Sequence, residues 1–258
     1  MALTQTAKIA IIISCCVVGA AAIVTPTTLV FLNNSTEVNF TLLYNAGVMI
    51  ETENVRIYVD PYNISYSYHE YPADIILITH PHGDHYDPAI INFLKTDDTL
   101  IVCPENMTEA IATFGATGVN PGDNFVHMGI NITAFYMYTE APEGYTPSHP
   151  PEANWTSYII DTGDFTFFHA GDSANIAEYT QISNQIDVAL LPLGPGCQTM
   201  TGIDVVYAID TINPIYMVPI HFAEGADVAF CAVYEDMITN AGCQLVHLNY
   251  FQSHVFEI

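Results

Sequence analysis

Basic side chains are almost missing from this sequence, which has 3 Lys and Arg residues against 28 Asp and Glu residues and a formal net charge of −25. Beyond Lys8, only Arg56 and Lys95 remain. Such a chain repels the phosphate groups of nucleic acids and of anionic lipid headgroups. We therefore expect no nucleic-acid partner. The same imbalance is also typical of adaptation to salt, to low pH or to trypsin-like proteases.

Cysteine is scarce as well, and none of the 6 cysteines are spaced as Cys-x-x-Cys. A zinc site built from thiolates is therefore not expected. Cys15 and Cys16 lie in an apolar run, whereas the others are spread through the remaining chain as Cys103, Cys197, Cys231 and Cys243. In an oxidising compartment these four could pair, and the sequence does not choose among the three connectivities.

The N-terminal region holds an apolar run from Ile9 to Val24 that no charge interrupts and that Lys8 precedes. Small residues near its end and Pro26 after it are typical of a secretory signal peptide or an uncleaved signal anchor. Continued to Leu32, the run is about long enough to span a bilayer. We expect residues 1–32 to form this segment, preferably as an anchor. Residues 33–258 would then form one domain that is secreted or held at the cell surface, with membrane contact through the N-terminal segment only.

Glycosylation sequons of the form Asn-x-Ser/Thr also favour export. They are acceptors only where the chain meets a glycosylation machinery. The sequence has seven: Asn33, Asn34, Asn39, Asn63, Asn106, Asn131 and Asn154.

Beyond the N-terminal region, short β-rich runs alternate with turns and then with helical patterns, without a linker that would divide the chain. Asp87 before Pro88 is a typical helix start, and Gly115 is a typical helix end. The patterns predict strands over 38–43, 48–51, 55–59, 75–79, 100–103, 125–127, 157–161, 165–169, 188–191 and 215–220, and helices over 89–95, 108–114, 203–212 and 228–240.

The segment His80-Pro81-His82-Gly83-Asp84-His85, which follows a predicted strand, is the most informative part of the sequence. His80 and His82 lie two residues apart and can direct their rings at one ion. Asp84 and His85 can turn toward a second ion close by. Histidine and carboxylate ligands at this density predict a two-metal site.

This His-x-His-x-Asp-His pattern resembles the signature of the metallo-β-lactamase superfamily. The resemblance implies an α/β fold, classed as α+β in some schemes, with four layers in the order αββα. It also implies that Asp60 orients a metal-binding histidine, that Asp172 in His169-Ala170-Gly171-Asp172 bridges two metals, and that His221 binds the second metal. Several further details are similar to the branch that contains the L-ascorbate-6-phosphate lactonase.

One ligand expected from the resemblance has no obvious position, because Tyr136-Met137-Tyr138 occupies the usual strand end. His149, in a loop before the strand predicted at 157–161, is the candidate that we choose. If His149 is not a ligand, the first metal lacks a protein ligand. His169 is expected near the site, either supporting a ligand or contacting substrate. Cys197 and Gln198 could line the same pocket.

The predicted activity is hydrolysis of an ester, lactone, amide or phosphodiester bond in a small-molecule substrate. Two divalent cations, zinc first and manganese or iron as alternatives, would activate a water molecule, with Asp84 as ligand and proton shuttle. The rival interpretation is a non-catalytic or weakly metal-binding surface glycoprotein that retains the fold. The oligomeric state is not predicted. The remaining histidines are expected at the surface or in structural roles: His69, His127, His247 and His254.

Overall fold

The structure is a computed structural model that describes residues 37–141 and 143–257. The apolar run that we expect to be a signal or anchor, and the sequons Asn33 and Asn34, lie outside these residues. Within the described ranges, none of the helices combines the length and the apolar character needed to cross a bilayer.

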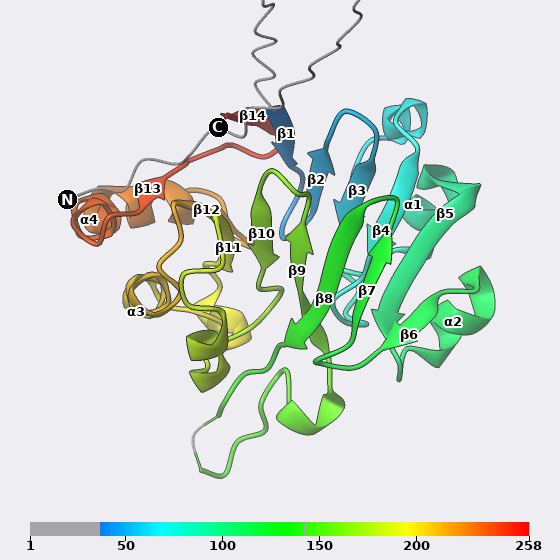
Figure 1. Cartoon of the computed structure of the whole chain (residues 1–258). Helices are drawn as coiled ribbons and strands as arrows, with labels where there is room; N and C mark the ends of the chain where they lie inside the picture. The colour runs from blue at the N-terminus through cyan, green and yellow to red at the C-terminus, as the bar shows by residue number, and fades with distance from the viewer. Residues whose placement is uncertain (1–36, 142, 258) are drawn as a thin grey trace, which may run out of the picture. The chain divides into compact units, whose positions relative to one another are not determined.

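Two mixed sheets of seven strands each form the centre of the fold (Figure 1). The first has the order β14-β1-β2-β3-β4-β5-β6 and the second has the order β13-β12-β11-β10-β9-β8-β7. The strands of the first sheet are β1 (Glu37–Leu42), β2 (Val48–Glu51), β3 (Arg56–Val59), β4 (Ala73–Leu77), β5 (Lys95–Pro104), β6 (Thr117–Val119) and β14 (Gln252–Glu257). Those of the second are β7 (Asn124–His127), β8 (Ile130–Tyr136), β9 (Thr156–Asp161), β10 (Thr166–His169), β11 (Val188–Pro192), β12 (Tyr216–Ile220) and β13 (Gln244–Leu245).

Helices lie on the two outer sides, with α1 and α2 next to the first sheet and α3 and α4 next to the second (Figure 1). Their ends carry the expected local signals: Asp87 caps α1 through its side chain, and Gly115 ends α2 at a φ of 67°. The α-helices are α1 (Pro88–Leu94), α2 (Thr108–Phe114), α3 (Gly202–Ile212) and α4 (Ala226–Asn240), and the short 3-10 helices are η1 (Tyr66–Glu70), η2 (Pro151–Ala153), η3 (Ala177–Ile182) and η4 (Pro195–Cys197).

The alternation of apolar residues in β4 shows how the layers are held together. Ile75 and Leu77 point into the cluster between the sheets, whereas Ile76 belongs to the cluster under α1 and α2. Side chains of a strand alternate between the two faces of its sheet, so an apolar run of this kind is buried on both faces. The four-layer αββα arrangement expected from the resemblance is confirmed.

Two local expectations were wrong. Lys95 does not end the first helix, because its backbone is already extended (φ −74°, ψ 148°) and it begins β5. The strand expected at 100–103 is therefore longer at its start, where Thr96 N–H donates to Thr99 Oγ1 in a local turn. The polar composition of this stretch hides the strand from a search for apolar alternation.

The parallel strands of both sheets run toward the same edge of the molecule, and this edge carries the site. In the first sheet β3 to β6 are parallel, and in the second β10 to β13 are parallel. Backbone contacts join the two sheets there: His221 N–H donates to Asn45 O at 3.0 Å, and Thr156 N–H donates to Thr79 O at 3.1 Å. Loops at the carboxyl ends of these strands therefore meet.

Candidate metal centre

The metal-binding candidates come from four loops that meet at this edge. His80 to His85 follow β4, Asp172 follows β10, and His221 follows β12. His149 lies in the loop between β8 and β9, just before η2. The structure thus brings together residues that are up to about 140 positions apart in the sequence, as the parallel strands require.

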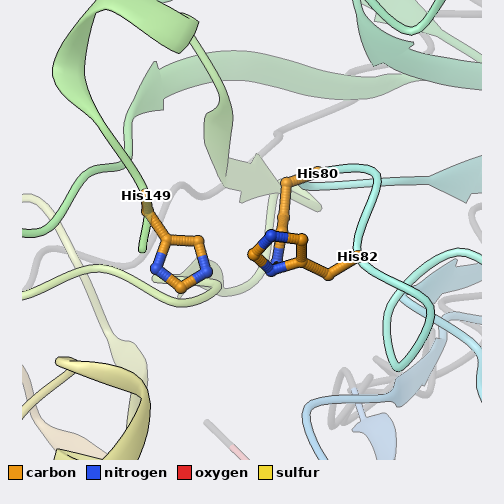
Figure 2. A group of neighbouring side chains, drawn as sticks. All are labelled: His80, His82 and His149. Carbon is orange, nitrogen blue, oxygen red and sulfur yellow. The ribbon is translucent and has the colours of Figure 1, made fainter. Parts of the chain in front are cut away.

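The first group consists of His80, His82 and His149, which offer ring nitrogens within 4.8 Å of one another. Figure 2 shows the three imidazoles directed toward a common region. His80 Nε2 and His82 Nδ1 are 3.1 Å apart, and His149 Nε2 lies 3.3 Å from Asp172 Oδ2. Three imidazoles and one carboxylate oxygen match the ligand number of a zinc site.

The second group consists of Asp84, His85 and His221, whose ligand atoms also lie within 4.8 Å of one another. His221 Nε2 is 3.5 Å from Asp84 Oδ2, and His85 Nε2 is 3.8 Å from the same oxygen. Asp172 Oδ1 lies 3.2 Å from His85 Nε2 and 3.4 Å from His221 Nε2. The two oxygens of Asp172 therefore face different groups, as a bridging carboxylate does.

Several buried polar atoms of these groups fit a bound cation. His85 Nε2, His221 Nε2, Asp172 Oδ1 and both ring nitrogens of His149 are buried and have no hydrogen-bond partner among the described residues. Leaving a buried polar atom unpaired costs about 1–3 kcal/mol. A set of lone pairs that converge without partners is explained if they coordinate a metal ion, so the residues present fit two divalent cations.

Asp60 fixes the ring orientation of ligands in both groups. It is fully buried, and its Oδ2 accepts hydrogen bonds from His85 Nδ1 at 2.8 Å and from Thr79 Oγ1 at 2.5 Å. Since the Thr79 hydroxyl donates to Asp60, it must accept from His80 Nδ1, at 2.9 Å. Both histidines therefore hold a proton at Nδ1 and direct Nε2 at the site, the ring orientation that a cation needs.

The protonation states of the ligands differ between the two groups. Burial, helped by the neighbouring His85, lowers the pKa of His80 well below its usual value. For His85, burial also acts to lower the pKa, but the carboxylates of Asp172 and Asp60 outweigh it and hold the pKa well above the usual value. The nearby His221 imidazole, with Nε2 3.5 Å from Asp84 Oδ2, lowers the pKa of Asp84 to about 2. A cation entering the second group must therefore displace a proton from His85.

His169 lies close to the site and is held by the backbone. It is fully buried, its Nε2 donates to Ala46 O at 2.8 Å, and its Nδ1 accepts from Gly171 N–H at 3.1 Å. Of the two alternatives left open for His169, these bonds favour support of a ligand. The ring positions the turn that carries Asp172.

The loop containing Cys197 and Gln198 supports His149 instead of lining the site through both side chains. Gln198 Oε1 accepts from Ser148 N–H at 2.8 Å, and Cys197 O accepts from Ser148 Oγ at 2.6 Å. Ser148 directly precedes His149, so these bonds fix the loop that carries the ligand. Cys197 itself is exposed and free. The cysteines Cys103, Cys231 and Cys243 are also free.

Two residues at the site were not identified from the sequence. Trp155, the only tryptophan in the chain, has its ring 5.3 Å from that of His80 and 5.1 Å from that of His82. Asn45 donates through Nδ2 to Asp84 Oδ2 at 3.1 Å. Trp155 could have been identified from the sequence, because it is a lone tryptophan close to the candidate ligand His149. The role of Asn45 depends on contact between distant loops.

The other histidines lie away from the ligands, as expected. His69 is exposed and its Nδ1 contacts Tyr66 O at 2.9 Å, whereas His247 Nε2 contacts Asp227 Oδ2 at 2.6 Å. His127 and His254 are partly buried in β7 and β14. None of these four belongs to the metal-binding groups found among the described residues.

Relatives with similar sequences come from archaea and bacteria. A UPF0173 protein from Pyrococcus abyssi is 29% identical over 180 residues, which cover 69% of this chain and 80% of the relative. A UPF0173 metal-dependent hydrolase from Anoxybacillus flavithermus is 29% identical over 192 residues, covering 68% of this chain and 81% of the relative.

Solved structures show the same architecture. A crystal structure from Parabacteroides distasonis, named for a metal-dependent hydrolase, has a TM-score of 0.72 at 26% identity and covers 83% of this chain and 94% of its own. Igni18, a metallo hydrolase from Ignicoccus hospitalis, has a TM-score of 0.70 at 21% identity. The match covers 86% of this chain and 100% of Igni18 and shows that the two proteins share a fold.

A family match decides the assignment. Residues 39–221 match the family described as beta-lactamase superfamily domain. This range includes every residue of the two metal-binding groups, from His80 to His221. The narrower resemblance to the lactonase-like branch stays a prediction. Because the match covers well over half of the chain, the protein belongs to the metallo-β-lactamase superfamily.

Proposed function

We propose that the protein is a metal-dependent hydrolase that uses two divalent cations to cleave an ester, lactone, amide or phosphodiester bond in a small molecule. The observation that carries this proposal is the pair of ligand groups on either side of the Asp172 carboxylate, with their buried nitrogens left unpaired. The relatives named metal-dependent hydrolases support it.

His80, His82, His149 and Asp172 Oδ2 would hold the first cation, and Asp84, His85, His221 and Asp172 Oδ1 would hold the second. Imidazole-rich sets of this kind suit zinc best, and manganese or iron accept the same mixture of imidazole and carboxylate. When bound, the two cations would supply Lewis acidity that lowers the pKa of a water molecule toward neutrality and polarises the bond to be cleaved.

Asp84 is the residue that we expect to move a proton. Its side chain is 44% exposed, in contrast to the buried ligands, so it borders the space where substrate would lie. Asn45 donates to its Oδ2 at 3.1 Å, and His221 Nε2 lies 3.5 Å from the same oxygen. Because its pKa is lowered to about 2, the carboxylate is ionised at neutral pH and releases a proton readily to the leaving group.

The surroundings of the site disfavour long anionic substrates. The Trp155 ring packs against the imidazoles of the first group. Neither Arg56 nor Lys95 lies at the site, since Arg56 bonds to Glu51 and Lys95 begins β5. A polyphosphate or nucleic-acid chain would therefore find no basic clamp, whereas a lactone, ester or amide needs none.

We also propose that the domain works outside the cell or at its surface, held by the N-terminal segment and glycosylated. The sequons Asn63 and Asn154 support this, because both asparagines are exposed. Digestion of intact source cells with proteinase K, followed by glycosidase treatment, tests the location. The domain should be lost from intact cells and should shift in mass. A protected domain without glycans would contradict this part of the proposal.

Metal analysis of the purified full-length protein tests the hydrolase. We expect about two equivalents of zinc, manganese or iron per chain. His82→Ala and Asp172→Ala should lose one or both, whereas His69→Ala, a matched change outside the site, should retain them. Esters, lactones, amides and phosphodiesters would then be screened before and after chelation. A folded wild-type chain that binds no metal would refute the hydrolase and favour the surface-glycoprotein alternative.

A further inference from the structure

A second hollow lies at the same edge of the molecule as the metal centre. It is a pocket of about 540 Å³ that is lined from the turn after β1, the loop after β12, the start of α4 and the loop before β14. These elements lie on the β1/β14 side of the two sheets (Figure 1). The volume is enough for a small organic group.

The pocket is joined to the second metal-binding group through adjacent residues. Tyr44 lines it, and the next residue, Asn45, donates to Asp84 Oδ2 and accepts from His221 N–H. Phe222 lines it as well and directly follows His221. Two short backbone segments therefore carry residues of both the second metal-binding group and the pocket.

Aromatic rings form its walls. Phe222 and Tyr250 are stacked with centroids 4.6 Å apart and an interplanar angle of 4°, and the Tyr44 ring lies 5.0 Å from that of Tyr250. The Tyr250 hydroxyl donates to Phe222 O at 2.7 Å and accepts from Phe222 N–H at 3.3 Å. The hydrogen bonds of the hydroxyl are thus satisfied within the wall. Phe222 is buried, whereas the Tyr44 side chain is exposed and is the ring most open to a ligand.

The charges at the pocket are negative. The carboxylates of Glu224 and Asp227 line it, and Glu224 is exposed, whereas Asp227 is buried and bonded to His247. Neither of the basic residues in the described part of the chain contributes to the lining. Aromatic faces next to carboxylates attract organic cations and repel anions.

We propose that this pocket binds the cationic end of the substrate, a protonated amine or a quaternary ammonium group, while the bond to be cleaved lies at the metal centre. The proposal rests on the proposed hydrolase function, because it assigns a substrate class to that site. It also agrees with the scarcity of Lys and Arg, since neither basic residue of the described part of the chain lines the pocket beside Glu224.

Binding of two molecules of equal shape tests the proposal without requiring turnover. Choline and its neutral counterpart 3,3-dimethylbutan-1-ol would be titrated into the metal-loaded full-length protein by calorimetry or saturation-transfer NMR. We expect choline to bind about ten-fold more tightly than the neutral alcohol. This preference should fall to about two-fold or less in Glu224→Gln and in Tyr44→Leu. It should persist in Glu53→Gln, which changes an exposed glutamate in the turn after β2, at the opposite edge.

Equal binding of the two alcohols, or a preference that survives both pocket substitutions, would overturn the proposal. The hydrolase proposal fails separately, by absence of bound metal or of any activity that a chelator removes. A protein that prefers choline but binds no metal would keep the cation pocket and lose the hydrolase. A metal-loaded hydrolase without the preference for choline would keep the hydrolase proposal and lose the cation pocket. Circular dichroism of each variant checks that it is folded.

Discussion

Replacing Asp60 by asparagine tests whether one buried carboxylate prepares ligands for both cations. The carboxylate accepts three hydrogen bonds, from Thr79 N–H, from the Thr79 hydroxyl and from His85 Nδ1. Asparagine has almost the same shape and can still accept from Thr79 N–H. At the position of Oδ2, however, it presents an N–H group, which faces two donors.

Metal binding is weakened whether the His85 proton stays on Nδ1 or moves to Nε2. If His85 keeps its proton on Nδ1, two buried donors face each other and the hydrogen bond is lost. If the proton moves to Nε2, it occupies the atom that lies 3.2 Å from Asp172 Oδ1 and that would bind the cation. A cost of about 1–3 kcal/mol for the lost or reversed bond corresponds to about a 5- to 150-fold weaker affinity. Loss of partners behind metal ligands typically has an effect of this size.

The assay is a titration of metal-free protein with zinc against a chromophoric chelator, analysed for two sites. We expect the site of His85 to weaken most and the site of His80 to weaken through Thr79. Asp74→Asn is the matched control, because Asp74 accepts from Arg56 N–H at 2.7 Å at the opposite end of the same strands. If Asp60→Asn binds both cations as tightly as the wild type does, the proposed role of Asp60 is wrong.

Three further predictions concern the same centre. The carboxylates around His85 hold its pKa above the unfolded value of 6.5. Without metal, the ion pairs of His85 therefore contribute their full stabilisation of the fold below pH 6.5. This stabilisation is lost as the pH rises through the folded pKa. Zinc uptake should then release about one proton at neutral pH, measured by calorimetry in buffers of different ionisation enthalpy, and no release would contradict the assignment. Gly194→Ala would place a Cβ 2.8 Å from His221 Nδ1, so zinc affinity at the second site should fall by about ten-fold or more, whereas Gly196→Ala, with nothing within 4 Å, should bind as the wild type does. Trp155 fluorescence should change when zinc binds, because the ring packs against the first group of imidazoles, and an unchanged spectrum during stoichiometric binding would refute this contact.

The sequence indicated the ligands well where the motif is local. His80 to His85 lie within six residues, and their spacing alone predicts a shared site. Asp172 and His221 could be found only through the family resemblance, because the contact between their loops depends on how parallel strands align. His149 had to be chosen from its place in a loop, and the structure puts it 3.3 Å from Asp172 Oδ2.

Features that depend on contacts between distant segments could not be derived in this way. The bond from Gln198 to Ser148 joins loops that are 50 positions apart. Strand β14 has no apolar run of its own and is formed by pairing with β1. The error at Lys95 has a different origin, since a polar strand start lacks the alternation by which strands are recognised.

The pairing of β1 with β14 also determines which way the metal centre faces. Glu37 lies opposite Glu257 at one end of this pair, and Leu42 lies opposite Gln252 at the other. The metal centre lies at the Leu42 end, about 20 Å away along a strand of this length. Glu37 therefore lies at the edge opposite the candidate ligands. A label attached to its side chain would leave the loops that carry these ligands uncovered.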